Sequence, residues 1–252
     1  MKSYVLDMDG VLYRGNQLIP GAREFIERLQ AGGHPFLFLT NNSQRTPIDF
    51  QRKLERMGLD VGAEHYFTSA MATAAFLQSQ KPGGTAFVIG EAGLSHALYQ
   101  VGYSITDVEP DYVVLGDTPS YDYTKIVHAV NLILGGARFV ATNPDVTGPQ
   151  EEGIHPACGA LAAPIERATG RQAYYVGKPN PLMMREALKR LDSHSEDSVM
   201  IGDRMDTDVL SGIGAGMHTV LVLTGVTTRA DLARFSYQPH EIVESLNDLT
   251  LE

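Results

Sequence analysis

The sequence is poor in cysteine and in long apolar runs. Its single cysteine, Cys158, excludes a disulfide within the chain and gives no sign of an oxidising compartment. No apolar run reaches the roughly 18 residues that a membrane-spanning helix needs, and the first residues lack the basic-then-apolar pattern of a secretory signal. We therefore expect a cytoplasmic protein that does not bind a membrane.

Basic charge is also scarce. The 20 Lys and Arg residues are outnumbered by 30 Asp and Glu residues, and the formal net charge is −10. Because no basic run offsets this charge, binding to nucleic acid is not expected. The eight histidines show no HxxxH or HExxH pairing, which argues against a histidine metal site. An anionic substrate would have to be attracted by local charges.

The chain alternates apolar runs typical of buried strands with amphipathic helical stretches. YVLDMD, FLFLTNN, VMIGD and TVLVLTG are typical of strands, whereas GAREFIERLQAGG and TPIDFQRKLERMG are typical of helices. Such alternation favours a parallel sheet with helices on its faces. We predict an α/β fold with a Rossmann-like, doubly wound parallel sheet.

A second domain is expected between Asn42 and Lys178, because this interval is far longer than one crossover helix requires. It contains the strand-like runs TAFVIGE, DYVVLGD and ARFVATN, with helical stretches between and after them. The Pro- and Gly-rich segment QKPGGT marks the entry, and the stretch before Gly177 marks the exit. The prediction is a discontinuous core of residues 1–80 and 176–252 with an α/β insert over 81–175.

Two carboxylates interrupt the first apolar strand. Asp7 and Asp9 are two residues apart, so both side chains point to the same side at the carboxyl end of the strand, roughly 7 Å apart. Open α/β sheets bind their ligands at that edge. Gly10 follows, where it allows a sharp turn and leaves room for a substrate.

Polar residues follow three other predicted strands as well. Taken singly, these are weak signals, since they are also common in turns, on solvated surfaces and at helix caps. Their recurrence at the carboxyl ends of several strands predicts one shared site. The residues are Thr40, Asn41 and Asn42 after FLFL, Lys178 after YYVG, and Asp203 after VMIG, with Asp208 five positions further on.

If the four aspartates of these clusters converge, they need a cation. Each pair of carboxylates at about 4 Å would cost about 4 kcal/mol at an effective dielectric constant near 20. An all-oxygen set favours Mg²⁺ over zinc. Lys178 adds one further positive charge, and Thr40, Asn41 and Asn42 offer hydrogen-bond donors for a phosphate.

This combination of charges favours phosphoryl transfer. Asp7 can attack phosphorus and form an aspartyl phosphate. Asp9 can protonate the leaving alkoxide and then accept a proton from the water that hydrolyses the intermediate. Asp7 and Asp9 would thus act as the nucleophile and the acid/base of a phosphatase.

The motifs DMDGV, the strand end at Thr40, Lys178 and GDRMDTD resemble the four motifs of the haloacid dehalogenase (HAD) superfamily, in their usual order. TNNS, ARFVATNPD and YVGKPNP resemble its NagD-type and 4-nitrophenylphosphatase-type subfamily. The resemblance covers essentially the whole chain and implies an α/β cap inserted between the second and third motifs. It also implies phosphatase activity, because Asp9 and Asp203 supply an acid/base and a metal ligand that dehalogenation would not need.

The resemblance further implies a role for each motif residue. Asp7 would be the nucleophile and Asp9 the acid/base, while Thr40 and Lys178 would contact the phosphate. Mg²⁺ would be bound by Asp7, by the backbone carbonyl of Asp9 and by Asp203. Asp208 would support the metal site from outside its ligand sphere.

The substrate and the phosphoryl acceptor stay open at this point. Asn143 and Asp145 could hydrogen-bond a sugar or a base, or could simply form an Asn-Pro-Asp turn. The resemblance implies small phosphomonoesters, either nucleoside monophosphates such as UMP or sugar phosphates. A phosphotransferase or mutase is an alternative. A phospho-accepting regulatory domain is disfavoured by the length of the chain. Homo-oligomerisation is compatible with the sequence.

Overall fold

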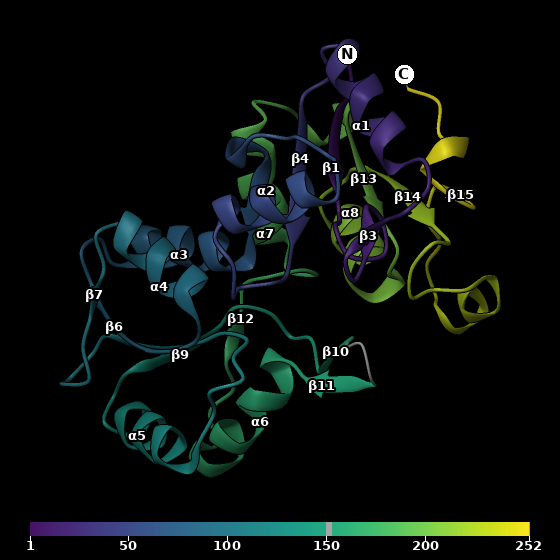
Figure 1. Ribbon diagram of the computed structural model, residues 1–252. Helices are drawn as coiled ribbons and strands as arrows, with labels where there is room; N and C mark the ends of the chain where they lie inside the picture. Colours follow the sequence, from purple (N-terminus) through teal and green to yellow (C-terminus); the bar gives the residue numbers. More distant parts are fainter. Residues whose placement is uncertain (150–152, 252) are drawn as a thin grey trace. The chain divides into compact units, whose positions relative to one another are not determined.

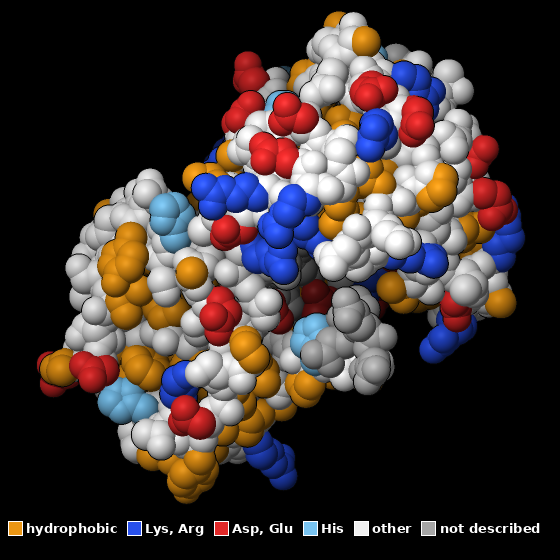
Figure 2. Space-filling view, viewed as in Figure 1, with side chains coloured by type: hydrophobic (Ala, Val, Ile, Leu, Met, Phe, Trp, Pro, Cys, Tyr) orange, Lys and Arg blue, Asp and Glu red, His pale blue; other side chains and the backbone are white. Residues whose placement is uncertain are grey.

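A computed structural model describes residues 1–149 and 153–251 of the chain. Within these residues, no helix combines the length and the apolar character needed to cross a membrane. Figure 2 shows acidic and basic side chains interspersed on the visible face, without a continuous basic field. This distribution agrees with the acidic composition.

The chain forms two compact units, each built on its own parallel sheet (Figure 1). Unit 1 consists of residues 1–40, 47–67 and 178–252, and unit 2 of residues 41–46 and 68–177.

The sheet of unit 1 has six strands in the order β15-β14-β13-β1-β4-β5. The central strand β1 pairs in parallel with both β13 and β4, and β13 pairs in parallel with β14. A small hairpin, β2 with β3, follows β1. The strands are β1 (Ser3–Leu6), β2 (Tyr13–Arg14), β3 (Gln17–Leu18), β4 (Phe36–Thr40), β5 (Tyr66–Thr68), β13 (Ser198–Gly202), β14 (His218–Val222) and β15 (Glu241–Val243).

Helices cover both faces of this sheet. Tyr4 and Leu6 of β1 belong to an apolar cluster with residues of α1 and α2, so these two helices cover one face. On the opposite face, a Cβ atom at Gly212 in α8 would lie 3.0 Å from the Cβ of Met200 in β13, so the helix backbone lies directly on the strand. The helices are α1 (Ala22–Ala31), α2 (Pro47–Arg56), α7 (Pro181–Arg190) and α8 (Leu210–Gly214), with short helical turns at Ala63–His65, Ser195–Asp197, Met205–Val209, Arg229–Arg234 and Leu246–Asp248.

Unit 2 has a five-stranded parallel sheet in the order β12-β9-β8-β6-β7, and a separate β10–β11 hairpin. Helices α5 and α6 pack together against β8, and α3 packs against α4. The elements are α3 (Ser69–Gln80), β6 (Thr85–Ile89), α4 (Ala92–Gln100), β7 (Ser104–Ile105), β8 (Tyr112–Leu115), α5 (Tyr123–Leu134), β9 (Arg138–Ala141), β10 (Thr147–Pro149), β11 (Ile154–Pro156), α6 (Cys158–Thr169) and β12 (Tyr174–Tyr175).

The predicted fold class is confirmed, because the unit 1 sheet is parallel and covered by helices on both faces, and a second α/β unit interrupts it. The bounds of unit 2 differ from the predicted insert of 81–175. It also contains α3, which packs on α4, and residues 41–46, where the Gln44 carbonyl accepts a hydrogen bond from the Gly93 N–H at 3.0 Å. That unit 2 acts as a cap stays a prediction.

Candidate active site

Asp7 and Asp9 lie just beyond β1. The Asp7 N–H donates to the Ile201 carbonyl at 2.8 Å, so the hydrogen-bond ladder between β1 and β13 extends past the strand and fixes the Asp7 backbone. The Asp7 side chain is buried, whereas Asp9 is exposed. Gly10 turns the chain after them with a φ of 80°. A Cβ atom at Gly10 would lie 2.6 Å from Asp203 Oδ2, so glycine permits a close approach of the two segments.

Lys178 is a buried cation between two carboxylates. Its Nζ lies 2.7 Å from Asp7 Oδ1, 2.7 Å from Asp208 Oδ1 and 3.3 Å from the Leu39 carbonyl. Burial alone would lower the pKa of Lys178, but the negative charges of Asp208 and Asp7 outweigh burial and raise it above its ordinary value. The side chain therefore stays charged and orients the Asp7 carboxylate.

Asp203 has one oxygen held tightly and one without a partner. Oδ2 accepts the Val226 N–H at 2.7 Å, and a Cβ atom at Gly225 would come within 1.9 Å of it. Oδ1 is buried and has no hydrogen bond from any of the described residues. Buried polar atoms are nearly always satisfied, so a carboxylate oxygen without a hydrogen bond fits the role of a cation ligand.

Asp208 supports this arrangement from a π-helical turn, Met205–Val209. Its Oδ2 accepts the N–H groups of Asp203 at 3.2 Å and Arg204 at 3.1 Å, while Oδ1 faces Lys178. A Cβ atom at Gly202 would lie 2.1 Å from the Asp208 Cβ, so the turn requires glycine at the end of β13. The π-helical turn thus places Asp208 in contact with both the Asp203 N–H and the Lys178 ammonium.

The three buried aspartates form one acidic cluster. Ligand oxygens of Asp7, Asp203 and Asp208 lie within 4.8 Å of one another. Burial, with Asp208 and Asp7, raises the pKa of Asp203 well above its ordinary value. Burial and Asp7 raise the pKa of Asp208 to about 6, although Lys178 opposes the shift. This crowding of negative charge and the orphaned Asp203 oxygen fit a divalent cation with oxygen ligands.

Thr40 ends β4, next to β1, and its side chain is buried at the same sheet edge as Asp7. The two asparagines that follow belong to unit 2 and make hydrogen bonds there. The Asn41 amide donates to Asp145 Oδ2 at 2.9 Å, and Asn42 Oδ1 accepts the Gln44 N–H at 3.0 Å. Their predicted contact with phosphate stays a prediction.

Asn143 and Asp145 also make hydrogen bonds within unit 2. The Asn143 side chain is 1% exposed, and its amide donates to the Asn41 carbonyl and to Asp117 Oδ2, both at 2.9 Å. Asn143 Oδ1 accepts the Asp145 N–H at 3.1 Å across Pro144. This is the Asn-Pro-Asp turn that the sequence offered as the alternative. A substrate contact by either side chain stays a prediction.

Two contributors to the site were missed by sequence reasoning. The loop after β14 supplies the Val226 N–H, and the glycine at 225 directly before it in LTGV was an available signal. Tyr13 donates a hydrogen bond to Asp9 Oδ2 at 3.0 Å. No motif pointed to Tyr13, because in the sequence it resembles any apolar residue of a short strand.

Comparisons with known proteins agree with this geometry. The family model described as haloacid dehalogenase-like hydrolase matches residues 4–104, and a HAD-hydrolase-like model matches residues 175–249. The chain is 52% identical to dihydroxyacetone phosphatase of Corynebacterium glutamicum, over 98% of this chain and 90% of that protein. The chain belongs to the haloacid dehalogenase-like hydrolase family.

Two further relatives indicate the subfamily to which this HAD-family chain belongs. It is 43% identical to ribonucleotide monophosphatase NagD of Escherichia coli K12, over 99% of this chain and 98% of NagD, and the solved structure of NagD superposes with a TM-score of 0.94. It is 40% identical to acid sugar phosphatase of Staphylococcus saprophyticus, over 100% of this chain and 97% of that protein. The predicted NagD-type subfamily and the assignment as a HAD-family phosphatase are confirmed.

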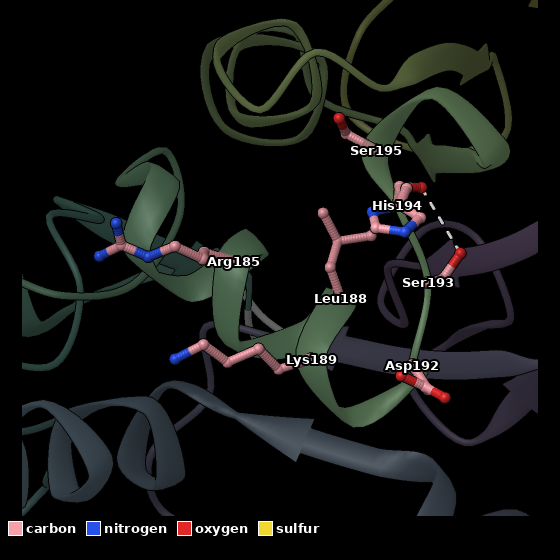
Figure 3. Close-up of a pocket in the computed structure, with 7 residues that line it drawn as sticks. All are labelled: Arg185, Leu188, Lys189, Asp192, Ser193, His194 and Ser195. Atoms are coloured by element: carbon pink, nitrogen blue, oxygen red, sulfur yellow. Dashed lines mark hydrogen bonds between the residues drawn. The ribbon is translucent and has the colours of Figure 1, made fainter.

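This HAD-family chain also has a surface hollow of about 360 Å³, which is lined by residues between 185 and 195. Figure 3 shows Arg185 and Lys189 extending on one side of Leu188, with Ser193 to Ser195 on the other. None of the cluster residues lines this hollow, so it does not belong to the site at the end of β1. Its lining residues are Arg185, Leu188, Lys189, Asp192, Ser193, His194 and Ser195.

Proposed function

We propose that this HAD-family phosphatase is a Mg²⁺-dependent phosphomonoester hydrolase that acts through an aspartyl phosphate on Asp7. The single observation that carries the proposal is the acidic cluster, in which Asp7 is held by Lys178 and a buried oxygen of Asp203 has no hydrogen bond within the part of the chain that the structure describes. A phosphoryl group carries negative charge, so such a site becomes productive only when cations balance its carboxylates.

The chemistry has two balanced steps. In the first, an Asp7 oxygen forms a bond to phosphorus, the bond from phosphorus to the ester oxygen breaks, and Asp9 gives its proton to the leaving alkoxide. In the second, Asp9 takes a proton from water, whose oxygen attacks phosphorus and releases inorganic phosphate and Asp7. The exposure of Asp9 and the burial of Asp7 suit these two roles.

The cation would be held by Asp7, the Asp9 backbone carbonyl and Asp203, with Asp208 orienting the group from behind. When bound, it supplies positive charge that offsets the carboxylates and the phosphate. Lys178 adds a fixed charge beside Asp7, and the Thr40 hydroxyl, at the same sheet edge, would donate to a phosphate oxygen. The all-oxygen donor set supports Mg²⁺ over softer metals.

For the substrate, we propose a small phosphorylated metabolite. The names of the relatives support two classes, sugar-like phosphates such as dihydroxyacetone phosphate and ribonucleoside monophosphates such as UMP. The relative with 52% identity favours testing the short sugar-like phosphates first.

The deciding experiment is a phosphomonoester panel that includes dihydroxyacetone phosphate, hexose phosphates, UMP and p-nitrophenyl phosphate. With Mg²⁺ we expect phosphate release, with the highest kcat/KM for one of the small metabolites, and EDTA should abolish it. If metal-supplemented protein releases no phosphate above the blank from any ester, the hydrolase proposal is wrong.

The same panel separates the alternatives. A phosphotransferase would give more dephosphorylated product than free phosphate when a sugar acceptor is added, whereas a hydrolase releases the two in equal amounts. A mutase would convert the ester into an isomeric phosphate and release neither. A phospho-accepting regulator would release at most one equivalent of leaving group per chain.

For unit 2, we propose that Asp145 helps to select the substrate. Asp145→Ala should then change the ranking of the metabolites in the panel by about 3-fold or more, while p-nitrophenyl phosphate changes less. Equal effects on all esters would assign Asp145 to the turn alone.

A further inference from the structure

Tyr13 connects the core of unit 1 to the exposed carboxylate of Asp9. Its side chain is 0% exposed, and its hydroxyl donates to Asp9 Oδ2 at 3.0 Å. The backbone closes the same loop, because the Gly10 N–H donates to the Tyr13 carbonyl at 2.9 Å. Asp9 thus receives a hydrogen bond from a donor that belongs to the core.

The phenol ring of Tyr13 is fixed from several sides. It belongs to the apolar cluster between the sheet, α1 and α2, and the Lys53 ammonium lies 3.6 Å from the ring centroid. Its neighbour Arg14 donates to the Thr224 carbonyl, and the Thr224 hydroxyl donates to the Gly10 carbonyl at 2.7 Å. The β2–β3 hairpin is therefore fastened to the loop after β14, and the hydroxyl has little freedom to move.

We propose that Tyr13 is a positioning residue that holds the Asp9 carboxyl in the orientation required for proton transfer. Proton transfer requires the carboxyl to lie within hydrogen-bond distance of the leaving oxygen, and a donor fixed in the core limits the rotamers that the Asp9 side chain adopts. Tyr13 acts through Asp9, to which its hydroxyl donates. This inference rests on the proposed role of Asp9 as acid and base.

The dependence on the leaving group tests this role. Departure of an alkoxide needs a proton from Asp9, whereas p-nitrophenolate is a weak base and leaves with little help. For Tyr13→Phe we expect kcat/KM to fall about 10-fold on dihydroxyacetone phosphate, or on the alkyl ester that the wild type prefers, and less than about 2-fold on p-nitrophenyl phosphate. A purely structural defect would lower both values equally.

The matched control is Tyr66→Phe. Tyr66 is also buried in unit 1, and its hydroxyl donates to the Val61 carbonyl at 3.4 Å rather than to a catalytic group. This variant loses the same atom from the same core, so we expect kcat/KM for both esters to stay within about 2-fold of the wild type. A selective loss in Tyr66→Phe equal to that in Tyr13→Phe would contradict the proposal.

A double-mutant cycle with Asp9→Asn distinguishes the proposed role of Tyr13 from the proposed role of Asp9. If Tyr13 acts through Asp9, Tyr13→Phe has no further effect on the alkyl ester once Asp9→Asn is present, because the two residues act as a unit. If Asp9→Asn shows the selective loss and Tyr13→Phe does not, this inference is wrong and the proposed function stands. If Asp9→Asn itself leaves alkyl-ester hydrolysis unchanged, the assigned role of Asp9 fails.

Lys53→Met provides a second variant that keeps the phenol in the core. It removes only the ammonium over the ring, and we expect a selective loss of about 2- to 3-fold on the alkyl ester. If Tyr13→Phe proves unstable, an absence of selectivity in Lys53→Met is sufficient to overturn the proposal.

Discussion

Both units place an aspartate just beyond a central parallel strand, yet the surroundings of the two side chains differ. In unit 2, Asp117 lies two residues after β8, and neutral donors satisfy both of its oxygens. In unit 1, Asp203 directly follows β13 and faces other carboxylates, and one of its oxygens has no hydrogen bond among residues 1–149 and 153–251. The donors to Asp117 are Ser43 Oγ at 3.1 Å, Asn143 Nδ2 at 2.9 Å and the Cys158 N–H at 2.9 Å.

The comparison shows that a polar side chain at a strand end does not by itself indicate chemistry. A half-buried carboxylate with hydrogen-bond donors on both oxygens fastens neighbouring segments, here residues 41–46 and the start of α6. A carboxylate that lies among other carboxylates and has an oxygen without a hydrogen-bond donor is suited to bind a cation. We therefore expect substitutions at the two strand ends to affect different properties.

The largest expected effect is on turnover. Asp7→Asn removes the proposed nucleophile but keeps the shape of the side chain, so kcat should fall by at least ~10³-fold while the protein still folds. Steady-state kinetics and circular dichroism measure the two quantities. Turnover near that of the wild type would exclude Asp7 as the nucleophile.

The next effect concerns the metal. Adding Mg²⁺ to EDTA-treated protein should raise Tm by roughly 5–10 °C near saturation, since binding stabilises the folded state. Asp203→Asn should lose this increase, and Asp117→Asn should keep it. A wild-type Tm that does not respond to Mg²⁺ would contradict the proposed metal site.

Asp117→Asn should affect stability more than chemistry. Its amide group faces donors that need an acceptor, which should cost about 1–3 kcal/mol in the free energy of unfolding. The value of kcat on p-nitrophenyl phosphate should stay within about 3-fold of the wild type. Urea unfolding followed by kinetics tests both, and a large kcat loss without destabilisation would show that Asp117 takes part in the reaction.

The smallest expected effect is on the rate at which a reagent labels the Cys158 thiol, which lies beside Asp117. Burial and the nearby Asp117 charge raise the pKa of the Cys158 thiol to about 12. The native protein thus keeps the thiol protonated where the unfolded chain ionises it, and this contribution to stability is lost as the pH rises toward 12. At pH 8 a thiol reagent should label native protein far more slowly than unfolded protein; equal rates would contradict the burial.

Much of unit 1 could be predicted because its signals are local. The strands ending at Leu6, Thr40 and Gly202 are continuous apolar runs, which are typical of buried parallel strands. The polar residues after them therefore had to meet at one edge. Short elements such as β2 and β15 were not predicted, because two or three residues carry too little periodicity.

Other features depend on partners far away in the sequence. Asn143 belongs to a turn because the Asn41 carbonyl and Asp117 accept its amide protons, and neither partner is visible locally. The π-helical turn that holds Asp208 arises because the side chain reaches back to the N–H groups of Asp203 and Arg204. The hydroxyl of Tyr13 gains a role only because its strand folds back beside Asp9.

The sequence by itself determined that Asp7, Thr40 and Asp203 reach the end of the unit 1 sheet, because strand period and strand length act over a few residues. The prediction that Lys178 also follows a strand of this sheet is wrong, since β12 belongs to the unit 2 sheet, and its position beside Asp7 depends on the tertiary structure. Only the tertiary structure decided which of the polar groups are satisfied and which are not. Hydrogen bonds and desolvation depend on the atoms that surround a group, and those atoms come from segments that folding alone brings together.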